Sequence, residues 1–305
     1  MTDTSTIDND GERMVPEIHR PSLMYAEHVT RYLAAADLVR GKRVLDIASG
    51  SGYGGHLLAR TAASVVGVDL SSDAVAYARA HYPAPNLEFR QGSAERIPLD
   101  DASVDVVTTF ETIEHVEDYR GFVAEIDRVL APGGVAVVST PNDLEFIEGN
   151  HFHLHEFVYD ELVELLAERF AHIRPYFQAT WKAVAVATED AFDREGTVDV
   201  EVHNLAPLER DQFLYFYLVC GREAADVEVP VRGLLALGAH WSDRERQTID
   251  LGLIAELDGL RAQVAALTAE RDGLRDDLRA VTSTRAYGLA RRLSAVAGRL
   301  GVRGR

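Results

Sequence analysis

The sequence predicts an α/β fold in which a doubly wound, mostly parallel sheet is covered by helices. Two observations support this fold class. Five short apolar runs recur at regular spacing between residues 44 and 140, and stretches with helical periodicity separate them. A glycine-rich segment follows the first run, as expected where a strand turns directly into a helix. Alternation of this kind forms right-handed crossovers between parallel strands.

The individual elements follow from these runs. Each run is short, apolar and bounded by polar or glycine-containing segments, which is typical of a buried strand. Strands are therefore expected at 44–48, 65–69, 87–91, 104–109 and 135–140, and helices at 21–40, 55–61, 73–81, 119–129 and 160–169. Three later β-rich runs, at 172–180, 182–188 and 212–220, are expected to complete the sheet with an antiparallel edge.

The whole chain divides into four parts. We expect a disordered leader over 1–18, one globular domain over 19–240, a long coiled-coil helix over 242–282 and a basic tail over 283–305. The leader is polar and acidic, and it lacks the basic-then-apolar order of a signal peptide.

The composition of the 305-residue chain argues against several functions. Its net charge of −18 does not suit general binding of nucleic acid, which depends on basic surface, so no nucleic-acid partner is expected. No run of about 18 apolar residues is present, so no membrane-spanning helix is predicted. Cys220 is the only cysteine, which excludes an intrachain disulfide and favours a reducing, cytoplasmic location.

The C-terminal part shows a second periodicity, with apolar residues at alternating spacings of four and three. This heptad pattern over 253–281 favours a coiled coil, in a homodimer or with a partner helix, over a helix packed on its own domain. Beyond it, six arginines and no acid occur from Val281 onward, so the tail is expected to contact an anionic membrane peripherally or an acidic partner. A solvated helix end is the alternative. The seam consists of Leu253, Leu257, Leu260, Val264, Leu267, Leu274, Leu278 and Val281.

The glycine-rich turn after the first strand indicates a nucleotide-type ligand. Glycines let the backbone approach a ligand closely and direct helix N–H groups toward it. Asp69 closes the second strand about 20 residues later, where an acid usually binds ribose hydroxyls. Gly50 and Gly52 alone would also fit a nucleotide-dependent dehydrogenase. The Gly-Ser-Gly-Tyr-Gly order and the acid Asp46 inside the strand favour a different cofactor.

Five segments, in order, resemble the successive motifs of class I S-adenosylmethionine (SAM) dependent methyltransferases. The resemblance covers about residues 20–220 and implies a Rossmann-like seven-stranded sheet, an enzyme and SAM as its cofactor. The segments are DIASGSGYG at 46–54, GVDLS at 67–71, GSAERIP at 92–98, VDVVTTFE at 104–111 and LAPGG at 130–134.

The same resemblance assigns roles residue by residue. It places the methionine end of SAM against the acid and turn after the first strand, and against the end of the fourth strand. The ribose and adenine would lie at the ends of the second and third strands. The implied cofactor residues are Asp46, Ala48, Ser49, Gly50, Gly52, Tyr53 and Phe110 for the methionine end, Asp69 for the ribose, and Leu70, Ser93 and Ala94 for adenine.

The acceptor site is expected just past the fourth strand, because ligands of such sheets bind at the carboxyl ends of the strands. Glu111, Glu114 and His115 have spacings that place them on one face of a helical turn, as a metal site or a crowded charge cluster. His153 follows the fifth strand as a fourth candidate ligand.

This Glu-x-x-Glu-His pattern with a later histidine resembles the Mg²⁺ site of small-RNA 2′-O-methyltransferases and, in part, ubiquinone-pathway O-methyltransferases. Carried over, the resemblance makes Glu111, Glu114, His115 and His153 the ligands of Mg²⁺, with His115 and His153 catalytic. Such a cation would chelate neighbouring hydroxyls and lower the pKa of one. In the alternative, the enzyme is metal-free and His115 is a general base or a pocket wall.

The acceptor is expected to be a hydroxyl of a sugar or surface glycan. A chelating cation favours a diol, and the segment STRAY at 283–287 resembles tails on enzymes of bacterial surface-polysaccharide assembly. Three alternatives stay open. They are a methyltransferase of quinones, phenols or other small secondary metabolites, an RNA ribose methyltransferase, which the acidic charge disfavours, and a SAM-binding scaffold that assembles a glycan-synthesis complex.

Overall fold

The computed structural model describes residues 13–19, 22–144, 152–180, 207–209 and 212–228, and isolated positions between 267 and 294. The chain separates into two compact units, Met1–Ala239 and His240–Arg305.

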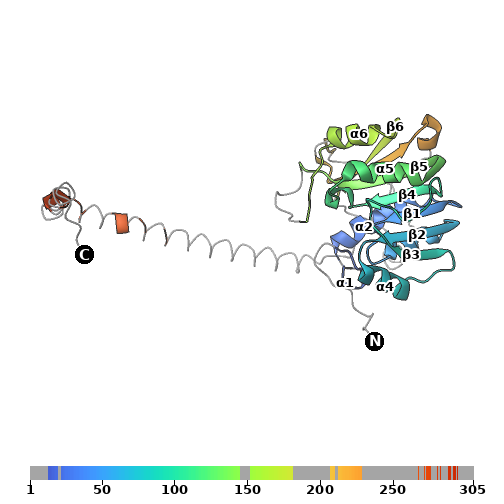
Figure 1. Ribbon diagram of the computed structural model, residues 1–305, viewed down its shortest axis with the longest axis horizontal. Coiled ribbons are helices and arrows are strands. Elements are labelled where there is room, and N and C mark those ends of the chain that lie inside the picture. The colour runs from blue at the N-terminus through green and yellow to red at the C-terminus, as the bar shows by residue number, and fades with distance from the viewer. Residues whose placement is uncertain are drawn as a thin grey trace. The chain divides into compact units, whose positions relative to one another are not determined.

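The described part of the first unit forms a seven-stranded sheet with helices around it (Figure 1). The strand order is β3-β2-β1-β4-β5-β7-β6, so that the chain starts in the middle of the sheet and winds outward in both directions. The strands are β1 (Arg43–Ile47), β2 (Ser64–Asp69), β3 (Leu87–Gln91), β4 (Val104–Phe110), β5 (Leu130–Pro141), β6 (His172–Gln178) and β7 (Tyr215–Gly221).

The direction of the strands agrees with the predicted mixed sheet. β1 to β5 are joined by parallel pairing, and β7 pairs antiparallel with both β5 and β6. The antiparallel strand, β7, is therefore second from the edge of the sheet, and β6 forms the edge itself. β5 begins at Leu130, earlier than the strand expected at 135–140, and its pairing with β4 is irregular in that first part. The strand predicted at 182–188 lies outside the described residues.

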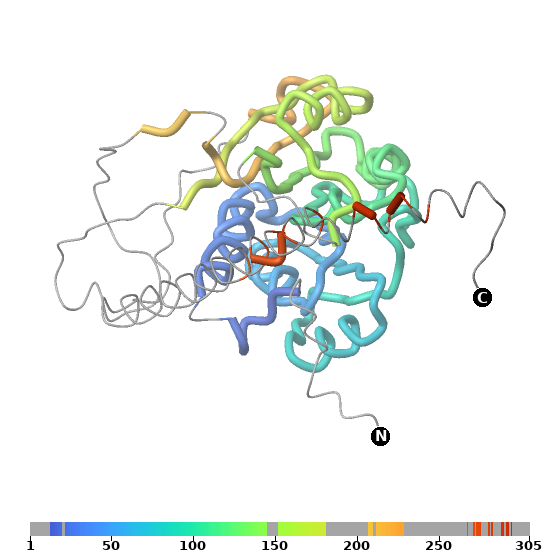
Figure 2. The backbone as a smooth tube through the Cα atoms, turned by 90° about the vertical axis from the view of Figure 1, so that its left-hand side faces the viewer, coloured from blue at the N-terminus to red at the C-terminus, as the bar shows by residue number. Residues whose placement is uncertain are grey.

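Helices cover both faces of the sheet because alternate residues of each strand point to opposite sides. Along β1, Leu45 packs into the apolar cluster with α5 (Tyr119–Val129) and α6 (Tyr159–Ala167), whereas Val44 packs into the cluster with α2 (Leu23–Ala35) and α3 (Tyr53–Ala59). Figure 2 shows α2 in blue and α5 in green on opposite sides of the sheet. The helices are α1 (Pro16–His19), α2 (Leu23–Ala35), α3 (Tyr53–Ala59), α4 (Ser72–His81), α5 (Tyr119–Val129) and α6 (Tyr159–Ala167), and the short 3₁₀ helices are η1 (Ile113–His115) and η3 (Ala224–Val227).

α5 shows how local sequence produces this packing. Its N-cap is Asp118, whose carboxylate accepts a hydrogen bond of 2.8 Å from the Gly121 backbone N–H. Phe122, Ile126 and Val129 then recur every three or four residues and are buried against the sheet. Burial of one such side chain contributes about 1.5–3 kcal/mol to stability.

The N-terminal boundary of the domain differs from the prediction. Residues 13–18 were assigned to the leader over 1–18, but they contact the domain and include the start of α1. Met14 and Val15 are buried, and the Ser51 hydroxyl donates a 2.8 Å hydrogen bond to the Met14 carbonyl. Two apolar residues in a polar segment were too weak a signal to predict this packing. The helix predicted at 21–40 is also shorter, because α2 ends at Ala35 and turns follow it.

The second unit is described only at scattered positions. Leu267, Arg271 and Gly273 are helical, and the Leu267 side chain is exposed. Most of the heptad seam over 253–281 lies outside the described residues, so the coiled coil stays a prediction. The basic tail contributes only a few described positions, and its contacts stay a prediction as well. Among the described helices, none combines the length and the apolar character that crossing a bilayer requires.

Candidate active site

The glycine turn after β1 is built from backbone conformations that suit glycine. Gly50 and Gly52 have positive φ angles of 55° and 91°, and Ala48 adopts the same left-handed region. A Cβ on Gly52 would also lie 2.5 Å from the Ala78 Cβ. The turn therefore presses closely against α4 and starts α3 directly after Gly52.

Asp69 connects this turn to the end of β2. Its Oδ2 accepts a 2.8 Å hydrogen bond from the Gly50 N–H, and its Oδ1 accepts one of 2.9 Å from the Ser71 N–H. Each carboxylate oxygen keeps a further lone pair. The residue that the resemblance assigns to the ribose hydroxyls thus also fixes the shape of the glycine turn.

The other predicted cofactor residues lie along the same carboxyl edge of the sheet. Leu70 follows Asp69 and is 72% exposed. Ser93 and Ala94 follow β3, and Phe110 ends β4. The structure thus places the predicted cofactor residues of four strands at one edge, which is where ligands bind in sheets of this kind.

Asp46 lies inside β1 and supports the turn from the sheet side. Its side chain is buried, and Oδ1 accepts a 2.8 Å hydrogen bond from the Thr108 hydroxyl. Burial raises the pKa of Asp46 to about 7. The carboxyl group is therefore partly protonated near neutral pH.

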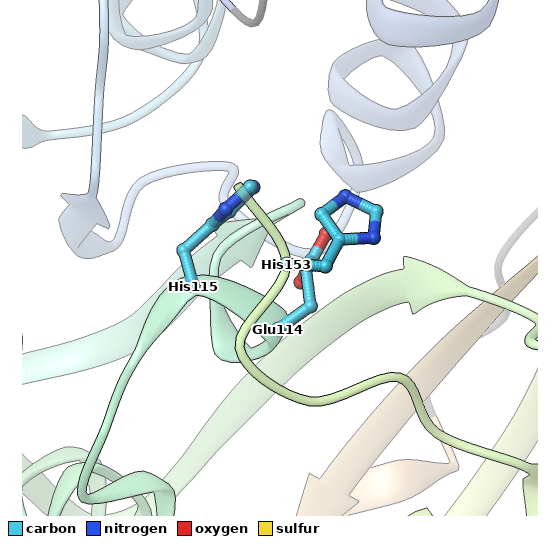
Figure 3. Close-up of side chains that lie close together, drawn as sticks. All are labelled: Glu114, His115 and His153. Carbon is cyan, nitrogen blue, oxygen red and sulfur yellow. The ribbon is translucent and has the colours of Figure 1, made fainter. Parts of the chain in front are cut away.

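Three of the four predicted metal ligands come together (Figure 3). One ligand atom from each of Glu114, His115 and His153 lies within 4.8 Å of the others. Glu114 and His115 belong to η1, directly after β4, and His153 comes from the segment after β5. The Glu114 carbonyl accepts hydrogen bonds of 2.8 and 3.2 Å from the N–H groups of Leu154 and His155. These backbone bonds hold the His153 segment against η1.

Each histidine of this cluster is oriented by a second contact. His115 Nδ1 lies 3.0 Å from the Phe152 carbonyl, which only accepts, so Nδ1 donates and the ring lone pair lies on Nε2. His153 Nδ1 lies 2.9 Å from the Glu156 carboxylate, an arrangement that places the lone pair of His153 on Nε2 as well. Hydrogen bonds of this kind fix the tautomer and ring direction of metal-binding histidines.

Glu114 is the buried member of this cluster. Thr140 donates a 3.0 Å hydrogen bond to its Oε2, but the buried Oε1 has no partner among the described residues. Burial and the neighbouring Glu111 carboxylate raise the pKa of Glu114 well above its usual value. A buried carboxylate oxygen without a donor, beside two oriented imidazoles, fits a divalent cation, because the cation would neutralise the charge and complete the bonding.

Glu111 does not join this cluster, and the helical turn predicted to carry it is absent. β4 continues to Phe110, and Glu111 then takes a left-handed backbone conformation with a φ of 53° before η1 begins. Its carboxylate accepts a 2.9 Å hydrogen bond from Ser139 and lies 3.6 Å from Arg31 Nη2. The left-handed backbone at Glu111 turns its side chain toward α2, where the buried guanidinium of Arg31 attracts it.

Arg31 and Tyr32 on α2 are site residues that the sequence did not reveal. The Arg31 side chain is 1% exposed, and Tyr32 packs edge-on against Tyr53 and Phe110. An arginine within an amphipathic helix normally faces solvent, so no local signal distinguished it. His151, which also lies near His153 in the sequence, falls outside the described residues.

Comparison with known proteins addresses the kind of domain that these residues belong to. Residues 45–138 match the family described as "Methyltransferase domain". A Mycolicibacterium smegmatis protein named "Probable S-adenosylmethionine-dependent methyltransferase" is 42% identical over 161 residues, which cover 51% of this chain and 62% of the relative. A Mycobacterium tuberculosis protein named phthiotriol/phenolphthiotriol dimycocerosates methyltransferase is 39% identical over 111 residues, which cover 35% of this chain and 41% of the relative.

The fold also matches a solved structure. A Thermotoga maritima SAM-dependent methyltransferase, titled a "possible histamine N-methyltransferase", superposes with a TM-score of 0.50 at 20% identity over 70% of this chain and 97% of that one. Residues 45–138 are therefore similar to a methyltransferase domain, and about half of the chain is similar to a probable SAM-dependent methyltransferase. It spans about 60% of the length of the M. smegmatis relative that it matches.

Proposed function

We propose that this chain transfers the methyl group of SAM to a hydroxyl of a sugar or surface glycan. The observation that carries the proposal is the cluster of Glu114, His115 and His153 at the carboxyl edge of the sheet. β1 and β4 are paired neighbours, so this cluster follows the strand next to the one that ends in the glycine turn. An imidazole base and a set of cation ligands are the groups that a hydroxyl acceptor requires.

The chemistry needs alignment and removal of a proton. The acceptor oxygen forms a bond to the methyl carbon while the carbon–sulfur bond of the sulfonium breaks, and S-adenosylhomocysteine (SAH) leaves. Without a cation, the lone pair on His115 Nε2 accepts the hydroxyl proton; with a cation bound to that lone pair, the proton passes to solvent water. Mg²⁺ or a similar cation held by Glu114, His115 and His153 would lower the pKa of the hydroxyl. The fixed Glu156 contact of His153 keeps that ring in place.

A lipid-like hydroxyl is the second candidate acceptor. One relative is named a methyltransferase of phthiotriol and phenolphthiotriol dimycocerosates. In this chain, Leu154 lies next to His153 in the sequence and is 62% exposed, and Leu144, at the other end of the same connecting segment, is 63% exposed. Exposed leucines beside an acceptor site favour a substrate with an apolar chain.

The two candidates can be separated by one screen. Purified protein and methyl-labelled SAM are incubated with nucleotide sugars, oligosaccharides, phenols and long-chain diols, with and without Mg²⁺. The proposal expects label in a sugar hydroxyl, loss of transfer in His115→Ala, and normal transfer in the control His172→Ala on the exposed start of β6. Label only in a long-chain diol would favour the second candidate. Transfer only to nitrogen or carbon would contradict both.

A further inference from the structure

A small cleft lies between α1, α2, α3 and the end of α4. Its volume is about 230 Å³, whereas sites for drug-sized ligands measure about 300–1,000 Å³, so its size suits a ligand with a single ring. None of Glu114, His115 and His153 lines it, and of the predicted cofactor residues only Tyr53 does. The cleft is therefore separate from the cluster and from most of the predicted cofactor site.

Aromatic rings form much of the wall of this cleft. Tyr25 of α2, Tyr53 at the start of α3 and Tyr82 after α4 line it. The His56 ring also lines the cleft and packs against the Tyr82 ring, with centroids 5.7 Å apart. Tyr25 and Tyr82 are half-buried, so part of each side chain stays accessible. Such rings offer a flat apolar surface on which the C–H face of a ring-shaped ligand can stack.

Charged groups of both signs border the same cleft. The Glu17 carboxylate accepts 3.0 Å hydrogen bonds from the Tyr77 and Tyr82 hydroxyls, one on each oxygen, and each oxygen keeps a further lone pair. Arg60 is exposed at the end of α3 and supplies several N–H donors. The cleft thus combines hydrogen-bond acceptors and donors with an aromatic wall.

This mixture of charges disfavours an ionic ligand. A quaternary ammonium group would suit the aromatic rings, but the Arg60 guanidinium lines the same cleft and repels it. An anion would suit Arg60, but the Glu17 carboxylate repels it. A neutral ring that carries several hydroxyl groups can use both side chains as hydrogen-bond partners and stack on the tyrosines. We propose that this cleft binds a neutral sugar ring, which goes beyond the hydroxyl methylated at the cluster.

The experiment measures the binding of simple glycosides by saturation-transfer NMR titration without SAM. The probes are the methyl glycosides of glucose, mannose and galactose, with benzoate as the anionic comparison and benzyltrimethylammonium as the cationic one. We expect at least one glycoside to bind the wild-type protein with a Kd of about 1–10 mM, a range that suits a ligand of about a dozen heavy atoms. Both ions should bind at least about tenfold more weakly than that glycoside.

Substitutions then locate the binding site. Leu57→Trp fills the cleft and should weaken glycoside binding at least about tenfold, whereas Arg60→Met removes donors and should weaken it about 3- to 10-fold. Arg40→Met is the matched control, because Arg40 is exposed and does not line the cleft, and it should keep wild-type affinity.

Glycoside binding that both cleft substitutions leave unchanged would overturn the assignment, as would tighter binding of either ion or no glycoside binding at all. Loss of glycoside binding in His115→Ala but not in Leu57→Trp would place the sugar at the cluster and also overturn it. If Leu57→Trp does not fold, Arg60→Met carries the same test. Failure of the proposed function is distinguishable, because the glycoside would still bind the cleft while no sugar hydroxyl gains label in the screen.

Discussion

Replacement of Asp46 by asparagine should remove a pH-dependent loss of stability from the centre of the sheet. The folded protein raises the pKa of this buried carboxyl from 3.8 to about 7. Between these values the folded state holds a proton that the unfolded state has released. The free energy of unfolding therefore falls as pH rises through this window, and it levels off above the folded pKa.

The size of the effect follows from the pKa difference. One pKa unit corresponds to about 1.4 kcal/mol, so the shift at Asp46 is worth about 4 kcal/mol over the whole window and about 3 kcal/mol between about pH 4.5 and pH 8. Asparagine has nearly the same shape as the protonated acid and does not titrate. Asp46→Asn should hence be close to wild type at the lower pH and more stable at the higher pH.

Urea unfolding of the ligand-free protein at both pH values provides the assay. The quantity compared is the difference in unfolding free energy between variant and wild type. Asp105→Asn is a control without this trend: the hydrogen bonds from Arg43 lower the pKa of Asp105, so their stabilisation is lost only in stronger acid, and this variant should lose nearly the same stability at both pH values. A constant difference between Asp46→Asn and wild type at both pH values would refute the reasoning.

Further predictions concern the cofactor turn and the cluster. Asp69→Ala removes the acceptor of the Gly50 and Ser71 N–H groups, so SAH should bind about 10- to 100-fold more weakly in calorimetry; unchanged affinity would contradict the ribose and turn assignments. Gly54→Ala places a methyl group against a tyrosine ring of α2, so chemical denaturation should show a loss of about 1–3 kcal/mol, and wild-type stability would contradict that packing. Thr140→Val removes the donor to Glu114 and should lower methyl transfer severalfold while SAH affinity is kept; equal loss of both would point to general unfolding.

The sheet could be predicted from the sequence because its signals are local. β1 to β5 lie within a few residues of the expected runs. Each strand is a short apolar segment, and helical segments separate one strand from the next along the chain. The glycine turn was also predictable, because its left-handed residues at Gly50 and Gly52 carry their own sequence signature. The resemblance of the motifs then separated SAM from other nucleotide cofactors.

The charged side chains of the site were less predictable because their partners are distant in the sequence. Arg31 lies beside Glu111, which follows β4, and Gln178, which ends β6. The helical spacing that placed Glu111 with Glu114 did not apply, because a left-handed residue ends the strand and redirects the first carboxylate. His153 reaches η1 through backbone hydrogen bonds to the Glu114 carbonyl, which no side-chain pattern encodes.

We propose that the cluster of Glu114, His115 and His153 performs methyl transfer from SAM to a hydroxyl. The most direct measurement is single-turnover transfer from labelled SAM to the acceptor found in the screen, after treatment with EDTA and again after addition of Mg²⁺ or Mn²⁺. We expect transfer to disappear with EDTA, to return with the cation, and to be absent in His153→Ala although this variant binds SAH as wild type does. Full transfer in EDTA together with unchanged turnover of His153→Ala would contradict the metal-assisted account.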